Sequence, residues 1–161
     1  MSPSIRPLED RDHEDVVALS LRAWAPVFTS LEYVLKGSEV FGQLHPDWRV
    51  SQQDAVAAVC SSDTIRAWVA EDDSAVAGFV AVQLDHEHSI GEIHMLAVDP
   101  THQHRGIGTS LTAFALDRIE EAGMAIAMVE TGADPSHAAA RRTYEQAGFT
   151  ALPVVRYFKK L

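Results

Sequence analysis

The sequence predicts an α/β (α+β) fold, in which helices cover both faces of a mixed, mostly antiparallel sheet. Strand-like and helix-like apolar patterns alternate along the chain. Two strand patterns, at residues 65–71 and 75–84, flank a polar turn and predict an antiparallel hairpin. A third strand pattern, at residues 90–98, leads through a glycine-containing turn directly into a helical pattern. Together these observations indicate one sheet with helices packed on it.

Length and composition limit the classes of function. A chain of 161 residues suits a single domain, residues 1–161, with a substantial core. Its net charge of −10 argues against a nucleic acid or an anionic membrane as a partner. No apolar run reaches the roughly 18 residues of a membrane span, and no secretory signal is visible at the start. Because Cys60 is the only cysteine, no intrachain disulfide can form, and a cytoplasmic protein is predicted.

The N-terminal third is expected to be mainly helical. Pro26 should end the first helix, and Gly37 should end the second. Between residues 38 and 49 no clear period exists. The expected elements here are a strand at residues 4–8 and helices at residues 12–25, 29–36 and 51–60.

The remaining two thirds supply most of the strands. Gly123 and Gly148 stand where helix ends are expected, and Asp134-Pro135 opens the last helix. An apolar run at residues 124–130 lacks alternation, which is typical of a strand covered on both faces. The expected elements are strands at 65–71, 75–84, 90–98, 124–130, 149–152 and 154–160, with helices at 107–122 and 134–147. The prediction is a sheet of six to seven strands with about four helices on its two faces.

The strand at residues 90–98 has two distinct faces. Alternation places Ile93, Met95 and Ala97 on one face. The other face carries Glu92, His94, Leu96 and Val98. The strand should stop at Asp99-Pro100, since proline has no N–H for the ladder.

The turn at residues 103–108 predicts an anion site. Gly106 and Gly108 leave backbone N–H groups uncovered just before a helix, where phosphate binds well. Gln103 and Arg105 can add donors. A P-loop would need Lys-Ser/Thr after the last glycine, and a dinucleotide fingerprint would need a third glycine at Leu111, so neither pattern fits.

Two motifs resemble one family of enzymes. The segment from Gln103 to Gly108, after LAVDP, resembles the Gln/Arg-x-x-Gly-x-Gly/Ala loop of the Gcn5-related N-acetyltransferases (GNAT). The last helix resembles the family's Asn-x-x-Ala-x-x-x-Tyr-Glu-x-x-Gly-Phe segment, with His137 in place of the asparagine. The resemblance covers nearly the whole chain, in detail from residue 90 to 149.

The resemblance implies acetyl-CoA as co-substrate. No metal is expected, because no cysteine accompanies the histidines at positions 86, 88, 94, 102 and 104. Acetyl-CoA would lie between the strands at residues 90–98 and 124–130, with its pantetheine arm added to the sheet like a strand. A histidine at position 137 could donate a hydrogen bond as the asparagine would. The implied cofactor-binding residues are Leu96, Ala97, Val98, Gln103, His104, Arg105, Gly106, Ile107, Gly108, Thr109, His137 and Tyr144.

The resemblance also implies direct attack of an amine on the thioester. Glu92 is the candidate base, acting through one ordered water, with His94 or bulk solvent as alternatives. The alternative for Glu92 is a solvated carboxylate at a strand start. Tyr144 is the candidate acid that protonates the thiolate, and its alternative is a packing residue. Cys60 is expected to be a small buried hydrophobe.

The acceptor is the least determined part of the prediction. The segment between the first two helices combines aromatic and acidic residues, which suit a cationic amine, although a core role for the aromatics fits equally. The leading prediction is a primary amine of a small molecule. The alternatives are a protein N-terminus or lysine and, from another class, a non-catalytic acyl-CoA-binding sensor. A homodimer is possible, and no nucleic acid or membrane partner is expected.

Overall fold

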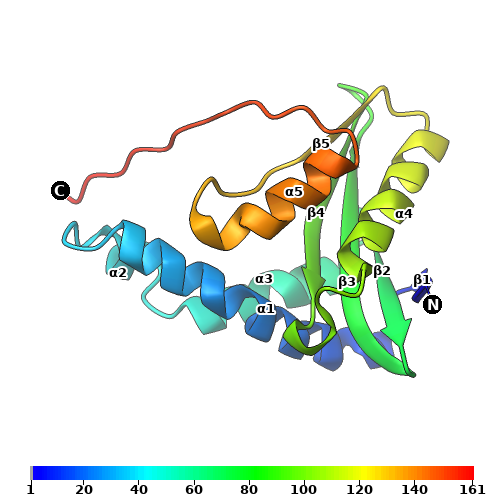
Figure 1. Cartoon of the computed structure of the whole chain (residues 1–161), viewed down its shortest axis with the longest axis horizontal. Helices are drawn as coiled ribbons and strands as arrows, with labels where there is room; N and C mark the ends of the chain where they lie inside the picture. The colour runs from blue at the N-terminus through cyan, green and yellow to red at the C-terminus, as the bar shows by residue number, and fades with distance from the viewer. Residues whose placement is uncertain (1) are drawn as a thin grey trace.

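The computed structural model describes residues 2–161 and places five strands of this part in one sheet (Figure 1). The strands are β1 (Ser4–Pro7), β2 (Ile65–Asp72), β3 (Ala75–Asp85), β4 (Ile90–Val98) and β5 (Ile126–Val129). The helices are α1 (His13–Val34), α2 (Val40–Leu44), α3 (Trp48–Cys60), α4 (Ile107–Glu121) and α5 (Ala138–Gln146), with 3-10 turns η1 (Asp10–Asp12), η2 (Pro100–His102) and η3 (Pro135–His137). None of the helices in residues 2–161 combines the length and apolarity that a membrane crossing needs.

The sheet is mixed and mostly antiparallel, which confirms the predicted fold class. Strands β1 to β4 pair antiparallel in chain order, and β5 pairs parallel to β4. The tight hairpin between β2 and β3 turns through Asp73 and Ser74, which both have positive φ. Within residues 2–161 the sheet has five strands, so the predicted number of six to seven is wrong.

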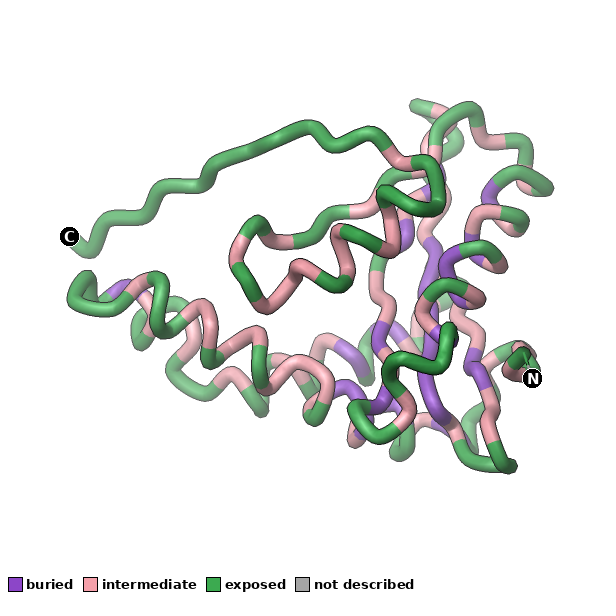
Figure 2. The backbone as a smooth tube through the Cα atoms, viewed as in Figure 1, coloured by how far each residue is buried: buried purple, intermediate pink, exposed green. Residues whose placement is uncertain are grey.

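Helices cover the sheet on both faces and bury one apolar cluster on each (Figure 2). On one face α4 packs over β3 and β4, with α5 beside it. On the other face α1 and α3 pack against β2, β3 and β4. The α4 cluster includes Val80, Ile93, Leu111, Ala115 and Ile119, and the α1–α3 cluster includes Val16, Leu19, Val56, Phe79 and Ala97.

Helix α1 continues through Pro26, so the prediction that it ends there is wrong. The ring removes one N–H and stands on an exposed side of the helix. Beyond the proline, Phe28 stacks on Trp48 of α3 with ring centroids 4.4 Å apart. This tertiary contact holds the second half of α1 in line, although the local sequence favours a break.

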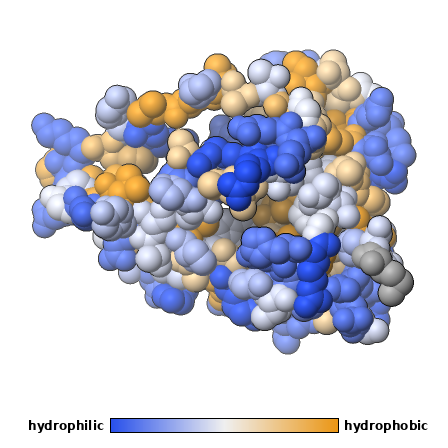
Figure 3. Space-filling model, in the orientation of Figure 1, coloured by the Kyte–Doolittle hydropathy of each residue, from blue (hydrophilic) through white to orange (hydrophobic). Residues whose placement is uncertain are grey.

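The segment after Gly148 contains no strand within the described residues, so the strands expected at 149–152 and 154–160 are wrong. It runs extended from the end of α5 towards α2, where Lys160 pairs with Glu39 at 3.0 Å (Figure 1). Its large side chains are exposed, at 85% for Leu152 and 90% for Tyr157. Figure 3 shows hydrophobic surface along the extended segment. Strand β5 is the edge strand of the sheet, and this segment does not pair with it, so its strand pattern does not become a strand.

Strand β5 is also less covered than predicted. Ala127 and Val129 pack against the α4 cluster, but Ile126 and Met128 on its other face are exposed. The expectation of a strand covered on both faces is therefore wrong.

A register shift interrupts β4 at His94. Ala81 of β3 lies opposite Met95, while the next residue, Val82, lies opposite Ile93, so His94 is an extra residue in β4. As a result Ile93 joins the α4 cluster, whereas Met95 and Ala97 face α1 and α3. The prediction of one common face for Ile93, Met95 and Ala97 is wrong, and the alternation from Glu92 to His94 is broken at the same point.

Candidate active site

Strands β4 and β5 diverge after a short paired stretch. They pair only from Ile90 to Ile93, opposite Ile126 to Val129. Beyond Ile93, β4 continues to Val98, and its edge towards β5 has no partner strand within residues 2–161. The backbone groups of residues 96–98 on that edge are therefore open to an extended ligand. Because β4 and β5 are parallel, the segments that follow them lie at the same edge of the sheet.

The predicted phosphate loop follows β4 at this edge. His104 and Gly106 both have positive φ, 63° and 79°, which turns the loop sharply before α4 begins at Ile107. No atom lies within 4 Å of the position that a Cβ on Gly106 would occupy. Gln103 and Arg105 are partly engaged, since the Gln103 amide donates to the carbonyl of Val98 and Arg105 pairs with Asp72 at 3.1 Å.

This geometry fits the diphosphate of an acetyl-CoA molecule. The loop is exposed, and the first backbone N–H groups of the 15-residue helix α4 have no acceptor within the helix. Successive residues with alternating backbone hand form a concave group of N–H donors that binds anions. In a chain of net charge −10, such fixed dipoles are the means by which an anion is held. The residues present at positions 103–109 therefore fit the group that the sequence predicts.

Asp99 anchors the start of this loop, and the sequence did not single it out. Its carboxylate accepts hydrogen bonds from the backbone N–H and the hydroxyl of Thr101, at 2.9 and 2.6 Å. The guanidinium of Arg22 on α1 binds its other oxygen. Burial opposes ionisation, but the bonds from Thr101 and Arg22 outweigh it and lower the pKa of Asp99 to about 2. The end of β4 is thus tied to α1.

A second buried aspartate, Asp134, lies in the turn after β5. Its Oδ2 accepts from the hydroxyl of Ser30 on α1 at 2.7 Å and from the backbone N–H and hydroxyl of Ser136. Its Oδ1 lies 2.5 Å from Nδ1 of His137. Burial opposes ionisation here too, but the bonds from Ser136, Ser30 and His137 hold the pKa of Asp134 well below its usual range.

The turn around Asp134 is fixed by two further residues. The guanidinium of Arg141 donates to the carbonyls of Gly132 and Asp134, at 2.6 and 2.8 Å. A Cβ on Gly132 would lie 2.5 Å from Nδ1 of His137 and would also collide with the Asp134 carboxylate. Only glycine leaves room for this arrangement. Arg141, which could have reached towards a phosphate, instead holds the turn.

The two predicted catalytic residues lie on different elements. Tyr144 stands on α5 and meets Phe149 edge to face, with ring centroids 5.9 Å apart. Burial raises the pKa of its hydroxyl, so this group keeps its proton at neutral pH. Glu92 is half-buried on β4 opposite Gln83, and His94 is exposed at the register shift.

Burial also raises the pKa of the Cys60 thiol on α3, which makes that thiol a poorer nucleophile.

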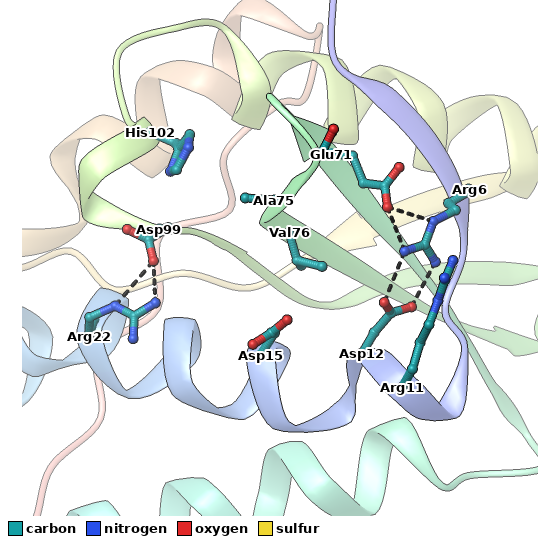
Figure 4. A pocket seen from close by; sticks show the side chains of 11 residues that line it. Arg6, Arg11, Asp12, Asp15, Arg22, Glu71, Ala75, Val76, Asp99 and His102 are labelled. Atoms are coloured by element: carbon teal, nitrogen blue, oxygen red, sulfur yellow. Dashed lines mark hydrogen bonds and ion pairs between the residues drawn. The ribbon is translucent and has the colours of Figure 1, made fainter.

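A polar cavity of about 580 Å³ lies beside η2 but is distinct from the predicted site (Figure 4). Arg6 binds Asp12 and Glu71 across it, and Arg22 binds Asp99 (Figure 4). These ion pairs tie β1 to β2 and to the start of α1, and α1 to the end of β4, around the cavity. None of the predicted catalytic or cofactor-binding residues lines it.

The aromatic residues near α2 mostly contact the chain itself. Phe28 stacks on Trp48 and meets His45 edge to face. The cation of Arg49 lies over Trp48 at 4.4 Å. Because Trp48 already contacts Phe28 and Arg49 of the same chain, a packing role is favoured over an aromatic cage for a cationic acceptor.

Comparison with known proteins identifies the family. A model described as the acetyltransferase (GNAT) family matches residues 31–149. The chain belongs to this family. The predicted family is thereby confirmed, and acetyl-CoA is the co-substrate that GNAT acetyltransferases use.

Relatives and solved structures agree with the GNAT assignment. Mycothiol acetyltransferase of Sanguibacter keddieii is 32% identical over 143 residues, covering 84% of this chain and 45% of the relative. That of Thermomonospora curvata is 28% identical, covering 92% and 51%. The chain spans about half the length of these curated relatives.

Among solved structures, the ribosomal-protein-S18-alanine N-acetyltransferase of Escherichia coli has a TM-score of 0.68 at 23% identity, covering 93% of this chain and 79% of that one. PaiA N-acetyltransferase of Thermoplasma acidophilum, in complex with coenzyme A, has a TM-score of 0.69 at 18% identity, covering 96% and 94%. At these identities the likeness concerns the fold.

Proposed function

We propose that the chain is an acetyl-CoA-dependent N-acetyltransferase whose acceptor is a primary amine of a small molecule. The observation that carries the proposal is the divergence of β4 from β5 beside an exposed loop of free amides at the start of α4. An extended arm and a diphosphate on one ligand require this pair of features. The name mycothiol acetyltransferase, which the curated relatives share, supports a small-molecule acceptor over a protein.

In this proposal the backbone holds most of the co-substrate. The open edge of Leu96, Ala97 and Val98 pairs with the pantetheine arm. Amides from His104 to Thr109 bind the diphosphate, and the side chains of Gln103 and Arg105 flank it. Arg105 is more than half exposed, so it can exchange Asp72 for a phosphate at little cost.

The chemistry needs one group that donates a proton and one that accepts it. Tyr144 is protonated at neutral pH and serves as the acid for the departing thiolate. For the proton that leaves the amine, the sequence offers Glu92 through an ordered water, with His94 and solvent as alternatives. Because of the register shift at His94, Glu92 and His94 do not share the strand face on which simple alternation placed them.

The first experiment tests the amide loop. Gly106→Glu places a negative side chain where the diphosphate binds, so calorimetry should show a large loss of acetyl-CoA affinity. Gly37→Glu is the matched control, because Gly37 has the same φ of 79° and also has no atom within 4 Å of its Cβ position. Equal acetyl-CoA affinity of folded Gly106→Glu and wild type would contradict the proposal.

The second experiment tests the acceptor class. The wild type is incubated with acetyl-CoA and a panel of small amines and peptides, and free thiol is measured. Turnover confined to small amines supports the proposal, while turnover only on peptides would replace it with a protein acetyltransferase. Tight acetyl-CoA binding without turnover on any amine would indicate a non-catalytic acyl-CoA sensor.

A further inference from the structure

His137 cannot act as a hydrogen-bond donor in the way that the family's asparagine would. An ionised carboxylate only accepts hydrogen bonds, so the contact between Asp134 and His137 places a proton on Nδ1 of the imidazole. A neutral imidazole carries a single N–H, and here that N–H donates its hydrogen bond to Asp134. The other nitrogen, Nε2, then presents a lone pair, which accepts a proton.

We propose that His137 is the general base of the acetyl transfer and that Asp134 is the residue that positions it. The inference rests on the proposed acetyltransferase function and deepens it, since it names the proton acceptor. In place of the three candidate bases, Glu92, His94 and solvent, it names one side chain whose orientation and tautomer are fixed.

Several contacts show that the pair is built into the fold. The side chains of Asp134 and His137 are only 9% and 19% exposed. Ser30 and Ser136 hold the carboxylate from two sides, and Gly132 provides the space that the imidazole fills. A buried carboxylate that orients an imidazole in this way fixes which ring nitrogen is free.

The pair also lies where the reaction is expected. It follows β5, at the same edge of the sheet as the amide loop that follows β4. Tyr144 lies two helical turns further along, on α5. At this contact α1 contributes the uncharged Ser30, α5 contributes Arg141, and Asp134 is the carboxylate that faces the ring.

The proton and electron balance of the step is complete without a further reagent. The acceptor ammonium loses one proton to Nε2 of His137. Its nitrogen then forms a bond to the thioester carbonyl carbon, and the carbon–sulfur bond breaks. Tyr144 donates its proton to the departing thiolate, and the second proton of the attacking nitrogen restores the Tyr144 hydroxyl. The imidazolium of His137 returns its proton to water, so one proton is released in total.

The test compares His137→Asn with wild type on an amine that the wild type acetylates. Asparagine restores a donor for acetyl-CoA but cannot take up a proton. We expect kcat to fall by about 10²-fold, with KM for acetyl-CoA little changed, and the acidic limb of the pH–rate profile to disappear. His88→Asn is the matched control, because His88 forms the same pair with Asp85 at 2.8 Å but on an exposed turn.

Three outcomes would overturn the assignment. Unchanged kcat and pH profile in folded His137→Asn would make His137 a structural residue. A change in KM for acetyl-CoA alone would make it a cofactor contact. Loss of the acidic limb in Glu92→Gln, with its retention in His137→Asn, would return the base to Glu92.

A second readout does not depend on turnover. Side-chain ¹⁵N NMR should show His137 of the wild type protonated on Nδ1, and Asp134→Asn should abolish this preference. The opposite tautomer in wild type would contradict the inference. Because this measurement needs no acceptor, a failed amine panel would refute the proposed function without bearing on the pair.

Discussion

The turns after β4 and β5 share the sequence Asp-Pro-Ser/Thr-His, at residues 99–102 and 134–137, but they use the aspartate differently. In both turns the carboxylate accepts from the backbone N–H and hydroxyl two residues later, and α1 supplies a further partner. After β4 that partner is Arg22, and the ring of His102 turns to the hydroxyl of Thr101 at 2.9 Å. After β5 the partner is Ser30, and Oδ1 of Asp134 is left for the histidine.

Two positions outside the shared sequence account for the difference. Arg22 brings a full positive charge to Asp99, whereas Ser30 brings none, so His137 is the side chain in contact with the Asp134 carboxylate that can carry charge. Two residues before Asp134 stands Gly132, whose missing Cβ leaves space for the imidazole against the carboxylate, whereas the corresponding residue before Asp99 is Ala97. The same four residues therefore give an anchoring ion pair in one turn and a carboxylate–imidazole pair in the other.

The largest effect is expected when the glycine of the second turn is made to match the first. Gly132→Ala puts a Cβ against both Asp134 and His137, so the pair must separate. Turnover should fall by about 10²-fold. The free energy of unfolding should fall by about 1–3 kcal/mol, as in other overpacked sites. Gly42→Ala is the control, since no atom lies within 4 Å of that Cβ position. Unchanged turnover and thermal midpoint would show that the turn accommodates a Cβ at position 132 without separating Asp134 from His137.

Exchanging each aspartate for asparagine should separate the roles of the two turns. Both substitutions remove a buried charged acceptor and should cost about 1–3 kcal/mol of unfolding free energy. Asp134→Asn should lower kcat, whereas Asp99→Asn should raise KM for acetyl-CoA, because Asp99 anchors the amide loop. Asp85→Asn, on an exposed turn, is the control for both. The same kinetic change in both variants would remove the distinction.

The ion pair of Asp99 with Arg22 should make the free energy of unfolding depend on pH in the acidic range. The folded-state pKa of Asp99, about 2, lies below its unfolded value, so the pair contributes stability above about pH 4. That stability is lost as the pH falls from about 4 towards 2. Asp99→Asn should flatten this loss by roughly 2 kcal/mol, measured by urea unfolding at a series of pH values. Parallel curves for the variant and the wild type would contradict the argument.

The smallest effect is expected at Ser30. Ser30→Ala removes one of the hydrogen bonds to Asp134 and leaves the contact with His137 in place. Unfolding free energy should fall by about 1 kcal/mol, and turnover should stay within roughly threefold of wild type. Thr29→Ala, at the adjacent exposed position, should have less effect on both. A tenfold loss of turnover in Ser30→Ala would mean that α1, and not Gly132, sets the orientation of the pair.

Much of the fold could be predicted because its signals are local. The hairpin turn, the strand at residues 90–98 and the helix ends at Gly123 and Gly148 each depend on a few adjacent residues. What failed depends on distant partners. The stacking of Phe28 on Trp48 carries α1 past Pro26, and the segment after Gly148 does not pair with the edge strand β5.

The candidate site likewise has a part that local sequence predicts and a part that it does not. The amide loop could be identified from its glycines and the helix that follows them. Asp99 and Asp134 were predicted only as a strand end and a helix start, and Gly132 was not predicted to have a role, although the recurrence of Asp-Pro-Ser/Thr-His is visible in the sequence. The contact of Ser30 with Asp134 joins residues 104 positions apart, and no spacing rule predicts it.

Pro26 divides α1 into halves that should differ in dynamics. Before it, Val16 and Leu19 are fully buried against the sheet, whereas no residue of α1 after it is buried. Proline leaves the carbonyl one turn earlier without its helical donor, which lowers the cost of bending at this point. Amide hydrogens after Pro26 should therefore exchange with solvent faster than those before it. Since Ser30 lies in the faster half, each opening of that half removes one hydrogen-bond donor from Asp134 while Ser136 and His137 remain in contact with it, so the environment of the pair fluctuates with the opening of a single helix.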